Sequence, residues 1–141
     1  MNFRQLQESD LLFMADHALY DKSHWKKPEG EIVYSYALEH EGNVLAIGGF
    51  IMIGKTCAIP WFDLSEYAKD NIVITYRVIK EWSENFCRSK GIKRMMAFVE
   101  VGFEAGERFC EHQGFHVESR MPKYEDDKPF DMWVKFIEDE T

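Results

Sequence analysis

Two carboxylates at the ends of predicted strands are the first candidates for chemistry in this sequence. Asp63 follows a predicted strand at 56–62, and Glu100 ends another at 92–100. A carboxylate in such a place can act as a general base if partial burial raises its pKa toward neutrality. Its commoner role is to stay solvated or to interact with the start of a neighbouring helix. Both roles stay open for Asp63 and for Glu100.

Cys110, His112 and His116 lie close together in the sequence and are residue types that bind zinc. Gly114, however, is expected to end a helix between the two histidines, and no second pair of ligands follows at metal spacing. A cysteine on a helix face that packs on a sheet is more often part of the core. The sequence therefore predicts no metal site here.

The best-defined elements surround these residues, between 92 and 120. The apolar run at 95–99 is typical of a strand that is buried on both faces. A helical pattern follows Gly102 and ends at Gly114. Apolar and polar residues then alternate at 115–120, which indicates a half-exposed strand. This stretch predicts a strand–helix–strand unit.

The rest of the chain reads as further strands and helices without a repeat or a linker, which predicts one domain over residues 1–141. Ser9 is expected to cap the first helix. Pro60 cannot donate a ladder hydrogen bond, so a bulge or a loss of pairing is expected around it. The other predicted elements are a short strand at 3–6, a loop or short helix at 21–30, strands at 32–39, 44–53, 56–62 and 130–136, a long helix at 72–90 and a loop at 122–128.

Composition limits the possible functions. The chain has 141 residues with a net charge of −8, and this acidic balance argues against nucleic-acid binding. It is compatible with a basic substrate, a basic protein partner or simple solubility. The three scattered cysteines fit a reducing compartment, and we see neither a leader pattern nor a membrane span. These features predict a cytoplasmic protein, in a bacterial or a host cell, with a virion as a further possibility.

The order of the elements, with residues 87–99 (CRSKGIKRMMAFV) and 108–115 (RFCEHQGF), resembles the GNAT (Gcn5-related N-acetyltransferase) superfamily, and more faintly its small phage-encoded members. The resemblance implies an α+β fold with a mixed, mostly antiparallel sheet of six to seven strands flanked by helices. It also implies that the fourth and fifth strands, at 56–62 and 92–100, splay apart around the pantetheine arm of acetyl-CoA. Pro60 fits that expectation.

The positions that the resemblance assigns to the cofactor depart from the family pattern. A glycine-rich turn before the long helix usually holds the pyrophosphate, but residues 65–73 (SEYAKDNIV) contain no glycine, and Glu66 and Asp70 would repel phosphate. Phe103 stands where an asparagine usually binds the cofactor arm, and Cys110 stands where a tyrosine often serves as general acid. The residues left as candidates for cofactor binding are Phe62, Ser65, Lys69, Asn71 and Phe103.

Two functions follow from the resemblance. The first is a degenerate acetyltransferase fold that binds acetyl-CoA weakly or not at all and acts as a binding or structural module for a protein partner. The alternative is an active acetyl-CoA-dependent N-acetyltransferase of an amine, with Asp63 or Glu100 as base and Cys110 or Tyr124 as acid. The departures at the cofactor positions favour the first function. A homo-oligomer is compatible with both functions.

Overall fold

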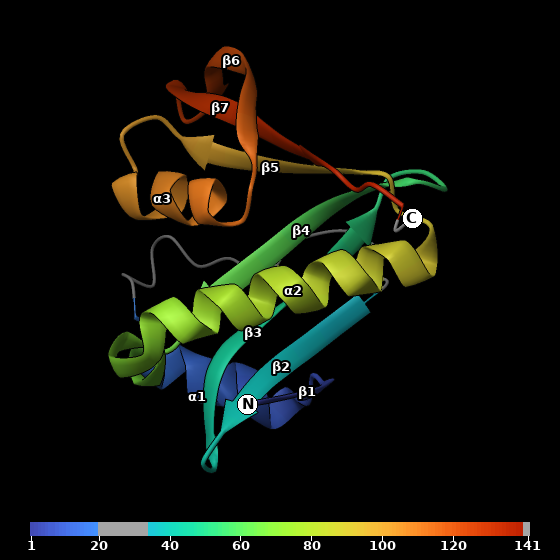
Figure 1. Ribbon diagram of the computed structural model, residues 1–141. Helices are drawn as coiled ribbons and strands as arrows, with labels where there is room; N and C mark the ends of the chain where they lie inside the picture. Colours follow the sequence, from blue (N-terminus) through green and yellow to red (C-terminus); the bar gives the residue numbers. More distant parts are fainter. Residues whose placement is uncertain (20–33, 140–141) are drawn as a thin grey trace. The chain divides into compact units, whose positions relative to one another are not determined.

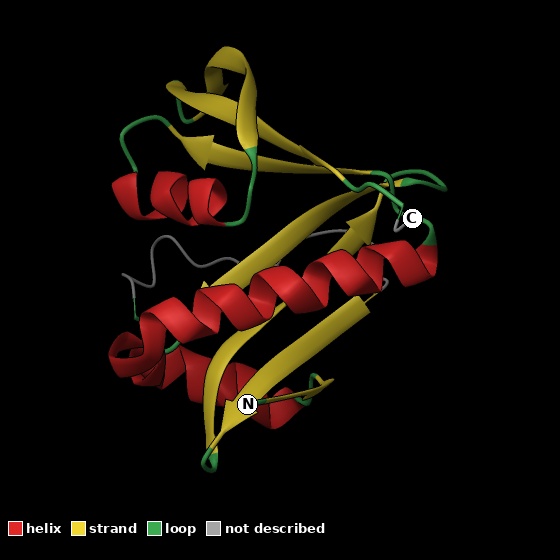
Figure 2. Ribbon diagram, in the orientation of Figure 1, coloured by secondary structure: helices red, strands yellow, loops and turns green. Residues whose placement is uncertain are grey.

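The structure is a computed structural model that describes residues 1–19 and 34–139. The predicted loop or helix at 21–30 lies outside the described residues. The helices and strands are shown in Figures 1 and 2. In chain order they are β1 (Asn2–Gln5), α1 (Glu8–His17), β2 (Tyr34–His40), β3 (Asn43–Met52), β4 (Cys57–Leu64), the 3-10 helix η2 (Glu66–Asn71), α2 (Ile72–Lys90), β5 (Arg94–Glu100), α3 (Glu104–His112), β6 (His116–Glu125) and β7 (Lys128–Phe136).

The strands form one seven-stranded sheet in the order β1-β2-β3-β4-β5-β7-β6. The pairs β1–β2, β2–β3, β5–β7 and β6–β7 are antiparallel, and β4–β5 is parallel. The predicted mixed, mostly antiparallel sheet of an α+β fold is confirmed. Within residues 1–19 and 34–139, no helix is long and apolar enough to cross a membrane.

The parallel pairing of β4 with β5 is short. Cys57 pairs with Arg94 and Ala58 with Met95, and the register goes no further. The two strands nevertheless continue to Leu64 and to Glu100. Pairing stops just before Pro60, which has no amide hydrogen to donate. The predicted loss of pairing at this proline is confirmed.

The described chain forms two compact units. Unit 1 comprises Met1–Met52 and Pro60–Val78, and unit 2 comprises Ile53–Ile59 and Ile79–Thr141. The prediction that residues 1–141 act as one domain stays a prediction. One buried hydrophobic core cluster of unit 1 joins α1 to the strands β2 and β3, and it consists of Met14, Ala37, Val44 and Ile47.

Two glycines in β3 let Trp61 of β4 approach this core closely. A Cβ atom on Gly48 would lie 2.7 Å from the Trp61 carbonyl oxygen, and one on Gly49 would lie 2.9 Å from the indole Nε1 of the same tryptophan. Distances under about 3 Å are steric clashes for carbon. The glycines are therefore needed for packing between neighbouring strands.

The start of α1 differs from the prediction. The helix begins at Glu8 with Gln7 as its N-cap residue, so the prediction that Ser9 caps it is wrong. The Gln7 amide donates to Asp10 Oδ2 at 2.7 Å. Asp10 also accepts two hydrogen bonds of 2.8 Å from the Arg4 guanidinium. This buried, paired carboxylate satisfies the first turn and fixes where the helix starts.

In unit 2, the prediction of a loop at 122–128 is also wrong. Strand β6 runs on to Glu125, and β7 begins at Lys128. Asp126 and Asp127 make the two-residue turn between them, with φ angles of 48° and 61°. Aspartate tolerates this left-handed geometry better than most residues do. A two-residue hairpin turn with positive φ at both central positions needs such residues at both.

Candidate active site

Asp63 is a buried carboxyl near the end of β4. The residue is only 8% exposed, and its Oδ2 has no hydrogen-bond partner among the described residues. Burial raises the pKa of Asp63 to about 7, although a hydrogen bond with the Leu64 backbone opposes the shift. A carboxyl with this pKa can accept or release a proton near neutral pH.

Ser65 follows β4 and is fully buried. Its hydroxyl donates to the Val44 carbonyl oxygen at 2.5 Å and accepts from the Tyr67 amide at 3.2 Å. Its own amide donates to the Leu45 carbonyl oxygen at 2.9 Å. These bonds hold the start of η2 against β3, so the polar groups of this predicted cofactor residue are engaged within the fold.

The segment for which the resemblance predicts pyrophosphate binding is η2, a 3-10 helix that continues directly into α2. A 3-10 helix binds its amides to carbonyls three residues earlier, as the Ala68 amide does with the Ser65 carbonyl oxygen at 3.1 Å. Lys69 is exposed and Asn71 is half-buried. The helical segment thus begins at Glu66, and the residues before α2 do not form an open turn of free amides.

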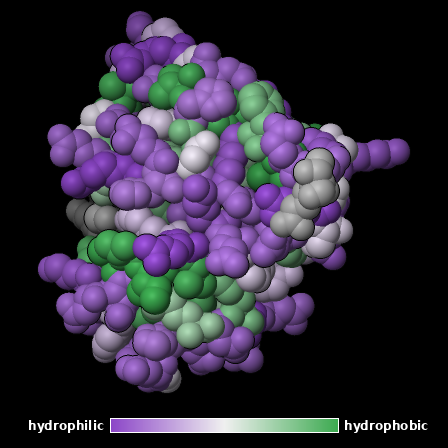
Figure 3. Space-filling model, in the orientation of Figure 1, coloured by the Kyte–Doolittle hydropathy of each residue, from purple (hydrophilic) through white to green (hydrophobic). Residues whose placement is uncertain are grey.

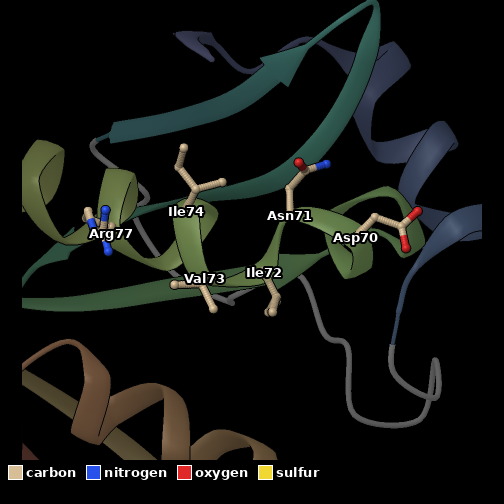
Figure 4. A pocket seen from close by; sticks show the side chains of 6 residues that line it. All are labelled: Asp70, Asn71, Ile72, Val73, Ile74 and Arg77. Carbon is tan, nitrogen blue, oxygen red and sulfur yellow. The ribbon is translucent and has the colours of Figure 1, made fainter.

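A shallow surface depression of about 290 Å³ lies at the junction of η2 and α2. It is lined by Asp70, Asn71, Ile72, Val73, Ile74 and Arg77. Figure 4 shows Asp70 at one end and Arg77 at the other, with three branched apolar side chains between them. This lining offers a phosphate one cation and one opposing carboxylate.

An aromatic cluster that no sequence pattern predicted lies beside η2. His17 of α1 places Nδ1 3.1 Å from Glu66 Oε1. Its ring centroid lies 4.4 Å from that of Phe13 and 5.6 Å from that of Tyr67. No local sequence pattern marks this contact, because His17 and Glu66 are 49 residues apart in the chain.

The candidates in unit 2 are placed differently. Glu100 pairs with Lys128 at 3.4 Å. Cys110 is 4% exposed, and burial raises the pKa of its thiol to about 12, so the group stays protonated and is a weak acid at neutral pH. The half-exposed Tyr124 stacks on Phe98 with ring centroids 5.6 Å apart.

Phe103, the fourth candidate in unit 2, is the N-cap residue of α3. Its ring packs so closely on the helix that a Cβ atom on Gly106 would lie 2.7 Å from it. Unit 2 also holds Glu100, Cys110 and Tyr124. β4 and η2 bring the other five candidates into one stretch of unit 1: Phe62, Asp63, Ser65, Lys69 and Asn71. The catalytic and cofactor roles of all nine stay predictions.

Among the described residues, no group of three or more His, Cys, Asp or Glu side chains could hold a metal ion.

Comparison with known proteins gives similarity in structure alone. No protein-family model matches the chain, and no curated protein matches its sequence. A chimera of the spermidine N-acetyltransferase SpeG from Vibrio cholerae and hSSAT aligns with a TM-score of 0.78 at 12% identity, over 96% of this chain and 94% of that one. A GNAT-family acetyltransferase from Streptococcus pneumoniae aligns with a TM-score of 0.72 at 11% identity, over 97% and 99% of the two chains.

A third solved structure is the yncA protein of Salmonella typhimurium with its cofactor acetyl-CoA. It aligns with a TM-score of 0.63 at 15% identity, over 76% of this chain and 66% of that one. At identities of 11–15%, these alignments show agreement in the course of the backbone alone. The chain has the fold of the GNAT acetyltransferases.

Proposed function

We propose that this chain is a binding module built on the acetyltransferase fold and that it does not use acetyl-CoA. The observation that carries the proposal is the 3-10 helix η2 (Glu66–Asn71), which runs into α2 where the resemblance predicts a glycine-rich phosphate turn. The other functional candidates support this reading, because Cys110 is a buried thiol and Glu100 is paired with Lys128.

The physical argument concerns the pyrophosphate of the cofactor. An anion binds at a helix start when several backbone amides point at it freely and the positive end of the helix dipole is accessible. Here the Tyr67 and Ala68 amides are bound to Ser65, and no glycine occurs from 65 to 73. Glu66 and Asp70 add negative charge at the same place, which lowers the affinity for phosphate further.

The test is a thermal-shift titration with acetyl-CoA, supported by calorimetry. A ligand with a Kd of about 10 µM at 1 mM would stabilise the folded state by about 2.7 kcal/mol and raise Tm by roughly 10 °C. We expect a shift of less than about 1 °C, because mass action requires binding to the folded state. Saturable binding by both methods would overturn the proposal.

A matched variant separates the causes of a negative result. The double substitution Glu66→Gly, Asp70→Gly removes both carboxylates and introduces glycine where amides must approach phosphate. If acetyl-CoA binds this variant and not the natural chain, the phosphate turn is what prevents binding. If acetyl-CoA binds neither the natural chain nor this variant, features outside these two positions also prevent binding.

The alternative function, acetyl transfer to an amine, is favoured by one observation, the pKa of about 7 at Asp63. As a base, this carboxylate would remove the proton from the amine, so the rate should rise as pH increases through about 7. Asp63→Asn should then lower kcat by about 10²-fold or more, while Glu100→Gln should not. Acetyl transfer with this pattern would support the enzyme in place of the binding module.

A further inference from the structure

Strand β5 of unit 2 is paired along its whole length on one side only. From Arg94 to Glu100 it pairs with β7. On its other side, the ladder with β4 ends where Met95 pairs with Ala58. Residues 96–100 are half-buried, so their backbone groups lie partly out of water and need hydrogen-bond partners. We call this second side of β5, beyond Met95, the β5 edge.

Hydrogen bonds near the start of β5 show which backbone groups face the β5 edge. The Arg94 amide donates to the carbonyl oxygen of Thr56, which precedes β4, at 3.2 Å. The Lys93 carbonyl oxygen accepts from the amide of Ile137, which follows β7, at 2.9 Å. Successive residues of a strand direct their backbone groups to opposite sides, so the even-numbered residues of β5 face the β5 edge.

Phe98 and Glu100 present three backbone groups at the β5 edge. In the part of the chain that the structure describes, the Phe98 amide, the Phe98 carbonyl oxygen and the Glu100 amide have no hydrogen-bond partner. The Glu100 carbonyl oxygen, in contrast, accepts from the Phe103 amide at 3.0 Å. A donor, an acceptor and a donor therefore follow one another along the strand. Another extended backbone carries the complementary groups at the same spacing.

The β5 edge differs from β6, the outer strand of the sheet. Nine of the ten residues of β6 are exposed, and its register with β7 is shifted twice. Hydrophilic residues predominate at the end of the β6–β7 hairpin, at the top of Figure 3. Residues 96–100 of β5 are half-buried, contain no proline and pair with β7 in an unshifted register. Since exposed charge, proline and shifted register keep strands from pairing, the β5 edge is the one open to a partner strand.

Side chains beside the β5 edge add a chemical preference. Phe98 stacks on Tyr124 with ring centroids 5.6 Å apart, and Glu100 lies two residues further along the same face of the strand. The Glu100 carboxylate attracts an ammonium group at the surface, because Nζ of Lys128 lies 3.4 Å from it with a side chain that is 59% exposed. Val99 lies between Phe98 and Glu100 on the opposite face. A partner strand would therefore meet an aromatic, an apolar and an acidic neighbour in turn.

We propose that the β5 edge binds an extended segment of a basic partner protein, which adds to β5 as an antiparallel strand. The segment residue opposite Phe98 exchanges two hydrogen bonds with it, and the residue two positions earlier accepts one from the Glu100 amide. Directly opposite residues share a face of the sheet, so the first position suits an aromatic side chain and the earlier one a lysine or arginine. The position between them, opposite Val99, suits an apolar residue.

The charge of the chain selects a basic partner. The net charge of −8 attracts a basic protein and repels a second copy of this chain. At the β5 edge itself, Glu100 fixes the position of one basic side chain. This inference rests on the proposed function, because it names the partner class of the binding module. The two fail separately, since saturable binding of acetyl-CoA contradicts the function and a peptide titration tests the strand addition alone.

The probe is a fluorescein-labelled peptide with the order Ser-Gly-Lys-Val-Tyr-Val-Ser, titrated with the full chain and followed by fluorescence anisotropy. Its lysine, first valine and tyrosine stand opposite Glu100, Val99 and Phe98. We expect saturable binding with a Kd of about 100 µM, the strength that a few main-chain hydrogen bonds and side-chain contacts supply. Anisotropy that does not saturate up to about 1 mM of the chain would overturn the inference.

Methylation of single peptide amides separates strand addition from contact through side chains alone. A methyl group on the tyrosine nitrogen removes the donor to the Phe98 carbonyl oxygen, so the affinity should fall by at least about tenfold. A methyl group on the nitrogen of the valine before this tyrosine should change the affinity by less than about twofold, because that amide points away from β5. Equal effects of the two methyl groups would contradict strand addition.

Charge exchange tests the position of the basic side chain. Glu100→Lys should weaken binding of the lysine peptide by at least about fivefold, and a peptide with glutamate in place of lysine should restore binding to this variant. Glu41→Lys makes the same change in net charge on the β2–β3 turn and is the matched control with unchanged affinity. Circular dichroism verifies that both variants are folded. Equal losses for the two variants, or no restoration by the glutamate peptide, would show that the peptide does not lie at the β5 edge.

Discussion

Replacing Asp63 with asparagine is expected to stabilise the folded protein at neutral pH. The buried carboxyl has a pKa raised from 3.8 to about 7, so its ionisation is opposed by the fold. Each unit of pKa difference lowers the free energy of unfolding at neutral pH by about 1.4 kcal/mol. Partial solvent screening reduces the whole loss from Asp63 to about 2–4 kcal/mol. The neutral amide of asparagine has a similar shape and avoids this cost.

The pH dependence identifies the cause. Between pH 3.8 and about 7 the folded state keeps the Asp63 proton while the unfolded state loses it, so this group lowers stability as pH rises through that window. The difference in unfolding free energy between Asp63→Asn and the natural chain should therefore grow from pH 4 to pH 7 and then stay constant. Urea unfolding at each pH measures it, with the exposed Asp16→Asn as control. A difference independent of pH would contradict the assignment.

Replacing Asp10 with alanine should lower the free energy of unfolding by about 3 kcal/mol and Tm by roughly 10 °C. The side chain is 4% exposed, receives both hydrogen bonds from Arg4 and accepts the Gln7 amide at the start of α1. Truncation leaves a partly buried guanidinium and a helix amide without this partner. The loss should be seen by thermal unfolding at neutral pH.

Glu39→Ala is the matched control for this prediction. Glu39 also pairs with Arg4, at 3.3 Å, but its side chain is 36% exposed, so its removal should cost less than about 1 kcal/mol. The hydrogen bonds from Arg4 hold the pKa of Asp10 below its usual value of 3.8. The stabilisation by Asp10 is therefore present above pH 3.8 and is lost as pH falls through the lower pKa of the folded state. Equal losses for both variants would be inconsistent with this account.

Hydropathic periodicity predicted the elements that have a single strong pattern. The strand–helix–strand unit at 92–120 corresponds to β5, α3 and the start of β6, with Gly114 at a φ of 87° after the helix. The predicted burial of its strands is wrong, because only Met95 of β5 is buried and residues 116–120 of β6 are all exposed. The start of α1 was mispredicted because Asp10 reaches back to Gln7, and a sequence reading favours the serine next to it. The loop at 122–128 was mispredicted because proline and charged residues also occur in an exposed edge strand.

The candidate site was less accessible to sequence reasoning. The position of Asp63 near a strand end suggested a base, but its burial depends on how β4 is covered in the folded chain. The missing glycine in residues 65–73 indicated a poor phosphate turn, whereas the continuous helix from η2 into α2 required coordinates. The ion pair of His17 with Glu66 joins distant segments, and no local pattern marks such contacts.

Strand β6 lies at the edge of the sheet, and nine of its ten residues are exposed. A long open edge invites the addition of further strands and the growth of fibres. This edge carries charges of both signs, Pro122, two register shifts and a positive φ of 54° at Lys123. The proline, the register shifts and the positive φ interrupt the row of backbone groups that an incoming strand would need, and the charged side chains disfavour its approach. A strand approaching β6 therefore finds few consecutive backbone groups to pair with.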